Sequence, residues 1–138
     1  MTAVVDHHAA LIYVMVTVSA ADGNMTDNEL RTIGDIVRHF PIFRGFDEEK
    51  LLTVAQQCAQ VIAASDNGLD TVLGLARQAL PERLRETAYA CAVEVAAADD
   101  RINKEELRVL DLIRHGLNID RLVAAAFERS AQARHMRA

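Results

Sequence analysis

Hydrophobic residues recur along this chain at the spacing of one helical face. In the first apolar segment they stand at Leu11, Val14, Met15 and Val18, the i, i+3, i+4, i+7 positions of a helix. The same spacing returns downstream, so the chain is predicted to be all-α, with seven helices and no strand. The seven helices are expected within Ala9–Ala21, from Thr26 to Phe40, from Asp47 through Ile62, over Leu69–Ala76, from Pro81 into 88–98, from Asn103 to Leu117, and from Asn118 or Asp120 through Phe127. Gly116 is expected to help end the sixth of them. The tail after Arg129, about residues 130–138, is expected to fray.

The chain contains an internal repeat with a period of 77 residues. When residues 11–37 are aligned with 88–114, nine of the 27 pairs are identical. The segment Ile12–Val18 is rich in β-branched residues and, taken alone, also fits a strand. Its Ala-rich counterpart has high helix propensity, and two copies of one unit are expected to share one structure. The repeat predicts a single domain over residues 1–138, built from two helix-loop-helix units at about 11–40 and 88–117.

Each unit carries a capping pattern at the start of its second helix. Thr26 is followed three residues later by Glu29, and Asn103 by Glu106. In this pattern the first side chain accepts a hydrogen bond from a backbone amide of the new helix. The glutamate reaches back to the backbone amide of the capping residue. The two second helices are predicted to begin at these caps.

Composition and charge argue against some classes of protein function. Of the 138 residues, 51% are hydrophobic and 4% aromatic, with no Trp, so the core is expected to consist of Leu, Ile, Val and Ala. The formal net charge of -5 argues against binding to nucleic acid or to an anionic membrane, because Lys and Arg carry the affinity for phosphate. The charge is uneven, with four basic and ten acidic side chains in residues 1–70. This half is either simply solvated or attracts a cation or a basic partner.

The apolar stretch Ala9–Ala21 has the length of the hydrophobic part of a signal peptide, but no basic residue precedes it. It is also shorter than the ~20 residues that a membrane-spanning helix needs, and a similar pattern recurs at 88–98. We therefore interpret it as a core helix. Cys58 and Cys91 stand alone in apolar patterns, so both are expected to be reduced core residues of a cytosolic protein.

Two acidic loops contain the residues that most favour a specific chemistry. The run Asp22–Glu29 is similar to the second half of an EF-hand calcium loop, in which a glycine allows a sharp turn and the last glutamate gives the ion two oxygens. The preceding helix supplies apolar residues in place of the carboxylates of the first half, so the loop is not an EF-hand. The second loop, 99–106, has Asp100 in place of the glycine and Arg101 within it, which makes it the poorer ion site.

Two interpretations of these acids remain open. In the first, Glu29 and Glu106 only cap their helices, and the aspartates fill the turns. In the second, the two units pack about a pseudo-two-fold axis that brings four carboxylates together, and a cation between them relieves their repulsion. Hard oxygen ligands favour calcium or magnesium over zinc. The candidate metal ligands are Asp22, Glu29, Asp99 and Glu106, with Asn24, Asp27 and Asp100 as secondary candidates.

The doubled motif A-A-D-G-x-x-x-x-x-E-L and A-A-D-D-x-x-x-x-E-E-L, each after an apolar helix, resembles the TerB tellurite-resistance family and its TerB-like relatives over nearly the whole chain. The resemblance implies seven helices in two related halves, a cytoplasmic location and membership of the bacterial Ter stress-response system. It also implies association with the membrane protein TerC and with TerD-type calcium-binding proteins. The acidic positions of the family motif fall on Asp22, Glu29, Asp99 and Glu106, while Asp100 and Arg101 depart from the D-G form.

An enzyme is not expected from this sequence. It contains no nucleophile-elbow motif, no glycine-rich phosphate loop and no H-E-x-x-H. The pairs Arg38-His39 and Arg114-His115 are placed at the ends of the two second helices, where cations interact favourably with the negative helix terminus. His7-His8 is interpreted as a pair of solvated side chains near a flexible start.

Two classes of function follow. In the first, the protein is a stress-response adaptor in which an ion in the acidic loops tightens the pairing of the two units and so presents a surface to a partner. In the second, it is a metal-independent helical interaction module or a homodimer, in which the acids only cap helices. A hydrolytic enzyme that uses paired carboxylates is the weakest alternative.

Overall fold

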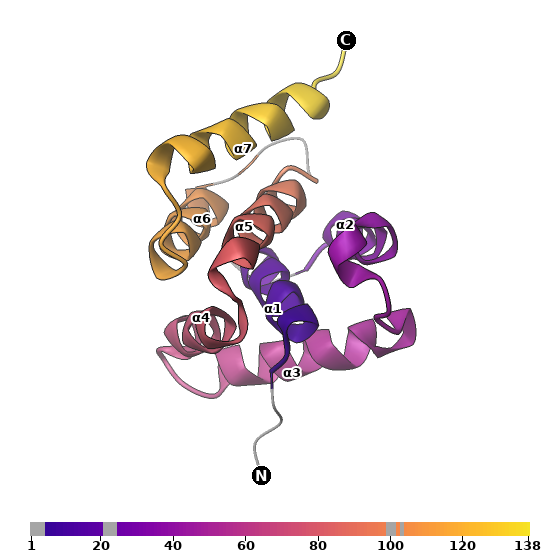
Figure 1. Ribbon diagram of the computed structural model, residues 1–138, viewed down its shortest axis with the longest axis vertical. Helices are drawn as coiled ribbons and strands as arrows, with labels where there is room; N and C mark the ends of the chain where they lie inside the picture. The colour runs from indigo at the N-terminus through magenta and orange to yellow at the C-terminus, as the bar shows by residue number, and fades with distance from the viewer. Residues whose placement is uncertain (1–4, 21–24, 99–101, 103) are drawn as a thin grey trace.

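The computed structural model describes residues 5–20, 25–98, 102 and 104–138, and that part of the chain folds into seven α-helices (Figure 1). Two short 3-10 turns, η2 (Pro41–Phe43) and η3 (Glu48–Lys50), connect the second helix to the third. The described residues contain no strand, which confirms the all-α prediction, including the helix over residues 12–18. The helices are α1 (His7–Ser19), α2 (Asp27–His39), α3 (Leu51–Ala63), α4 (Gly68–Ala79), α5 (Glu82–Ala96), α6 (Lys104–Gly116) and α7 (Arg121–Arg134).

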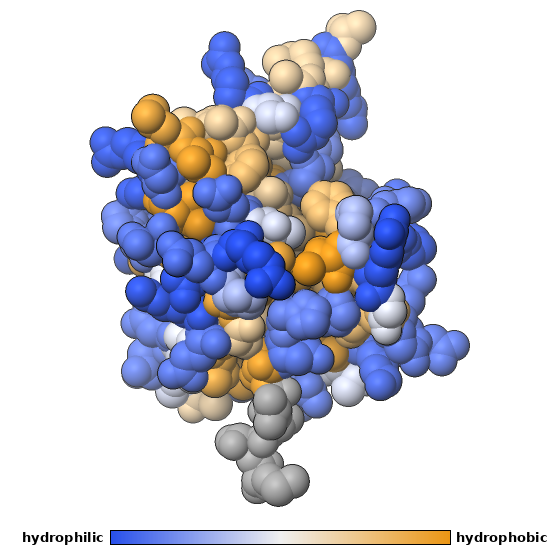
Figure 2. Space-filling view, in the orientation of Figure 1, coloured by the Kyte–Doolittle hydropathy of each residue, from blue (hydrophilic) through white to orange (hydrophobic). Residues whose placement is uncertain are grey.

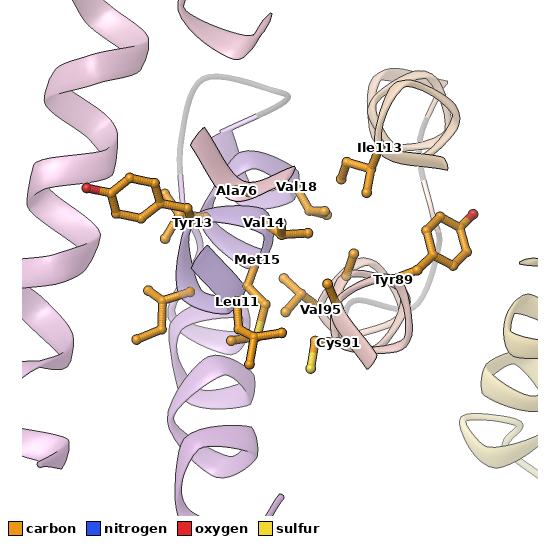
Figure 3. Packing of buried hydrophobic residues seen from close by; sticks show 14 of the residues in the cluster. Leu11, Tyr13, Val14, Met15, Val18, Ala76, Tyr89, Cys91, Val95 and Ile113 are labelled. Carbon is orange, nitrogen blue, oxygen red and sulfur yellow. The ribbon is translucent and has the colours of Figure 1, made fainter. Parts of the chain in front are cut away.

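Helix α1 lies at the centre of the molecule, and α2 to α6 surround it (Figure 1). Every residue from Ala10 to Ser19 is buried, as expected for a helix that is apolar on all sides. Its β-branched residues disfavour a helix only slightly, and burial of their side chains outweighs that preference. Figure 3 shows how the side chains of α1 divide between its neighbours: Leu11 and Met15 lie toward Cys91 and Val95 of α5.

Hydrogen bonds at the ends of the helices agree with most of the predicted boundaries. Asp6 caps α1 by accepting from the backbone amide of Ala9, and Asp120 caps α7 by accepting from the amide of Leu122. Helix α2 ends before Pro41, and α5 begins directly after Pro81. The end of α6 differs from the prediction that Gly116 helps to terminate it. Gly116 is the last helical residue, and the chain leaves the helix through Asn118.

Asn118 has a positive φ of 55°, and the amide of the next residue, Ile119, donates to the carbonyl of Arg114. This is the hydrogen bond of a left-handed C-terminal cap, a position that Asn tolerates better than other non-glycine residues. The exit from α6 is therefore set by Asn118.

The helices of the two predicted units have matching boundaries. Helices α1 and α5 end at Ser19 and Ala96, and α2 and α6 begin at Asp27 and Lys104. Each pair is separated by 77 residues, the period of the sequence repeat. The pseudo-two-fold packing of the two units stays a prediction.

The C-terminal tail is more ordered than the sequence predicted. Helix α7 continues to Arg134, beyond the expected fray from Arg129, and Ala131 is buried. The guanidinium of Arg134 lies against the carboxylate of Glu94 on α5, and Nε2 of His135 is 3.3 Å from the same carboxylate. A buried alanine and two basic groups on one acid hold this end of α7 in place.

The visible surface in Figure 2 is mostly hydrophilic, with hydrophobic side chains gathered where α6 and the beginning of α7 lie. None of the helices described here is long and apolar enough to cross a membrane.

Candidate functional site

Glu29 lies at the start of α2 and takes part in a reciprocal cap. The amide of Thr26 donates to Oε1 of Glu29 at 2.9 Å, and the amide of Glu29 donates to Oγ1 of Thr26 at 3.1 Å. This confirms the capping pattern predicted from Thr26 and Glu29. Glu29 is only 1% exposed, whereas a glutamate is almost never fully buried unless it is paired.

Glu106 occupies the corresponding place on α6. Both glutamates are the third residue of a 13-residue helix, 77 positions apart, and Glu106 is 2% exposed. The amino end of a helix carries a partial positive charge that stabilises an anion in the first turn. The two helices therefore hold one buried carboxylate each, in the same local position.

The other predicted metal ligands divide into one residue that the structure describes and four that it does not. Asp27 is exposed at the first residue of α2. The remaining ligand candidates lie outside the described residues: Asp22, Asn24, Asp99 and Asp100. The predicted cap residue Asn103 lies outside them as well. Among the residues that are described, no three His, Cys, Asp or Glu side chains form a group able to hold a metal ion. The convergence of the four acids therefore stays a prediction.

Each buried glutamate is followed by an exposed leucine that lines a surface groove. Leu107 lies in a groove of about 780 Å³ formed by α6, α7 and the end of α5, which we name the C-terminal groove. Leu30 lies in a groove of about 490 Å³ formed by α2, η3 and α3, which we name the α2–α3 groove. The two leucines are 52% and 41% exposed. Each buried glutamate is therefore the direct sequence neighbour of a leucine that lines a groove. A partner can contact the chain at either groove.

The C-terminal groove has an apolar floor and a mostly basic rim. Ala97, Ile102 and Leu110 contribute to the floor, and the exposed Met136 also lines the groove. The acidic and basic residues around it are Glu128, Arg129, His135 and Arg137. A volume of this size falls in the range of sites that bind small molecules or short peptide segments.

Tyr89 and Glu128 connect this groove to the core. The Tyr89 hydroxyl is buried on α5 and donates to Oε2 of Glu128 on α7 at 2.6 Å. Burial, and then this hydrogen bond to a carboxylate, raise the pKa of Tyr89 above its usual value of 10.0. The tyrosine therefore stays protonated and keeps donating throughout the physiological pH range.

His39 and His115 lie at the ends of α2 and α6, where the sequence placed them. Nδ1 of His39 is 2.8 Å from the carbonyl of Asp35, and Nδ1 of His115 is 2.8 Å from the carbonyl of Asp111. Each ring thus contacts a carbonyl four residues back, in the last turn of its own helix. This supports the interpretation of both residues as C-terminal caps.

His8 differs from the interpretation of His7-His8 as solvated. Nε2 of His8 is 2.7 Å from the carbonyl of Ile42, and its ring stacks on Phe43 with 5.5 Å between centroids. Phe46 contacts the same ring edge-on. No sequence pattern indicated this contact, because it joins residues 34 positions apart. His8 attaches the start of α1 to the turn η2.

The two cysteines are free and buried, as predicted. Burial raises the pKa of each thiol to about 12. Since the thiolate is the reactive form of cysteine, these groups are poor nucleophiles and poor metal ligands at neutral pH. Cys58 and Cys91 therefore serve the packing of the core.

The chain matches a known protein family. The model of the family described as tellurite resistance protein TerB matches residues 8–129, which includes α1 from its second residue, α2 to α6, most of α7 and both acidic loops. No curated protein and no solved structure matches the chain.

Proposed function

The chain belongs to the TerB tellurite-resistance family, and on that premise we propose that it is a non-enzymatic cytoplasmic adaptor of the tellurite-resistance stress response. The family match supports a role of the tellurite-resistance type. The adaptor role is supported by the absence of recognisable catalytic motifs from the sequence and by the two grooves that border the acidic loops.

One observation supports the involvement of an ion more than any other. Glu29 and Glu106 are both buried, in equivalent first turns, and each closes a loop that begins with an aspartate in the sequence. A helix cap explains a glutamate or glutamine at this position, but it does not require an acid at the start of each loop as well. We propose that Asp22, Glu29, Asp99 and Glu106 hold a calcium or magnesium ion, because these hard cations prefer carboxylate oxygens.

The C-terminal groove is the surface that such an ion would regulate. Glu106 belongs to the second acidic loop, and the neighbouring Leu107 lines this groove. Occupancy of the loop would fix the first turn of α6 and with it the position of Leu107. We propose that the partners contacted in this way include a TerC-like membrane protein and TerD-like calcium-binding proteins, the associates that the family resemblance implies.

A thermal melt of the full chain tests this proposal. The protein is melted in EDTA, then with excess CaCl₂ or MgCl₂, with KCl at equal ionic strength as the control. An ion that binds only the folded state stabilises it by about 2.7 kcal/mol at one hundred times Kd. We expect a higher Tm with calcium or magnesium than with KCl, and identical melts under all conditions would overturn the ion-binding role.

The alternative function also has a specific observation in its favour. The cap between Thr26 and Glu29 is complete in both directions, which gives Glu29 a structural role that needs no ion. On this alternative the protein is a metal-independent helical interaction module or a homodimer. Identical melts with and without divalent cations would favour it.

A further inference from the structure

The α2–α3 groove has walls of different charge. The α2 wall carries Asp27, Arg31 and Arg38, whereas the opposite wall carries Glu48 and Glu49 on η3. The groove is therefore more basic on one side and acidic on the other. Each wall also presents one exposed leucine, Leu30 on α2 and Leu52 on α3.

One ion pair already joins the two walls of this groove. Nη1 of Arg38 is 2.7 Å from Oε1 of Glu48, so these two groups neutralise each other across the walls. Nη2 of Arg38 also contacts Asp35 on its own helix. Within the part of the chain described here, Arg31 and Glu49 form no ion pair. Apart from the ion pairs of the described residues, the α2 wall therefore carries Arg31 and Asp27, and the opposite wall carries Glu49.

From this arrangement we infer that the α2–α3 groove is a docking surface for a second copy of the same chain. A two-fold rotation places the α2 wall of one copy against the η3–α3 wall of the other. Leu30 then faces Leu52 of the second copy, and Arg31 faces Glu49 of the second copy. Because the axis repeats every contact, the dimer buries four leucines and forms two ion pairs.

A second copy suits this groove better than an unrelated partner. Two-fold dimers are the commonest soluble oligomers, and their interfaces require one surface that is complementary to itself. The matching leucines, with Arg31 on one wall and Glu49 on the other, meet that requirement. The C-terminal groove does not meet it, because Arg129, His135 and Arg137 leave its rim mostly basic.

The dimer is a property beyond the proposed adaptor function. The experiment that tests it requires no bound ion. Sedimentation equilibrium of the full chain is measured in EDTA from 1 to 100 μM. We expect a species of twice the 15.2 kDa chain mass that dissociates on dilution. A monomer at every concentration overturns the inference.

Charge reversal then tests the orientation of the two copies. Arg31→Glu and Glu49→Arg each place like charges opposite each other twice in the dimer, so each is expected to raise the dissociation constant at least tenfold. The double variant restores opposite charges and is expected to return the constant to within about threefold of the wild type. A double variant no tighter than the single variants overturns the proposed pairing.

A matched pair of leucine variants tests the location of the surface. Leu52→Glu puts a charge into the centre of the proposed contact and is expected to give a monomer. Leu107→Glu changes a similarly exposed leucine in the C-terminal groove and is expected to leave the dimer unchanged. Circular dichroism of both variants checks that each is folded. A dimer that survives Leu52→Glu, or that Leu107→Glu disrupts equally, overturns the inference.

Discussion

The hydroxyl of Tyr89 donates a 2.6 Å hydrogen bond to the carboxylate of Glu128, and this contact joins α5 to α7 across 39 residues of sequence. We expect Tyr89→Phe to reduce the free energy of unfolding by about 1 kcal/mol, the usual net value of one hydrogen bond. Urea denaturation measures the change. Tyr13→Phe is the control, because no hydrogen bond to the Tyr13 hydroxyl occurs among the described residues. Equal losses in the two variants would contradict a specific role for the bond to Glu128.

Gly68 at the start of α4 is predicted to resist substitution. A Cβ atom built on this residue lies 2.2 Å from the backbone carbonyl oxygen of Ile62, and a backbone atom cannot move aside cheaply. We expect Gly68→Ala to lower the free energy of unfolding by about 1–3 kcal/mol, the range for overpacked sites. Gly74→Ala, on the same helix with nothing within 4 Å of its added Cβ, should instead stabilise by about 0.5–1 kcal/mol. Both values come from urea denaturation, and a tolerated Gly68→Ala would refute the close approach.

The buried thiols make stability depend on alkaline pH. Cys58 and Cys91 have pKa values near 12 in the folded chain, against 9.0 for an unperturbed thiol. The folded state therefore keeps protons that the unfolded state loses between pH 9 and 12, so stability is intact below pH 9 and falls through that interval. Urea denaturation at pH 8 and pH 10.5 measures the fall. The double variant Cys58→Ala with Cys91→Ala should show a shallower fall, and an equal slope would contradict the assignment.

Thiol labelling at pH 8 provides a separate check on the same two residues. A protonated, buried thiol reacts slowly with a disulfide reagent, since the thiolate is the nucleophile. We expect little labelling of the folded chain and two thiols labelled per chain in denaturant. Rapid labelling of the folded protein would show that Cys58 or Cys91 is exposed.

The fold was largely predictable because its determinants are local. Apolar spacing, the Thr26 cap and the break before Pro41 all act within a few residues of where a helix begins or ends. The β-branched residues of 12–18 pointed to a strand, and comparison with the Ala-rich second unit corrected that preference. Local patterns of this kind are readable without knowledge of tertiary contacts.

Three features were not predictable, because each depends on residues distant in the sequence. The tail was expected to fray, but Arg134 and His135 contact Glu94 some 40 residues earlier. The packing of His8 against Phe43 and the pairing of Tyr89 with Glu128 also join separate elements. Their individual side chains have no periodic signature, so only the folded chain reveals them.

The candidate site was predictable in part. Sequence comparison selected Glu29 and Glu106 because the repeat places an acid at both positions, and both prove to be buried in the first turn of a helix. Burial itself was not predictable, since a glutamate in a capping pattern is usually solvent-exposed. The grooves beside Leu30 and Leu107 were also missed, because each is formed by helices from different parts of the chain.

Ion binding by the acidic loops is tested most directly by calorimetry. Calcium and magnesium are titrated into the wild-type chain and into the variants Glu29→Gln and Glu106→Gln. Gln retains the acceptor oxygen of the cap, so both variants should remain folded. The first loop contains a glycine and no cationic residue, whereas Arg101 and Lys104 stand among the acids of the second loop in the sequence. We therefore predict that Glu29→Gln weakens ion binding more than Glu106→Gln. Equal weakening would contradict the predicted difference and favour one shared central site. No binding to the wild type would contradict the ion-binding account itself and leave both glutamates as helix caps.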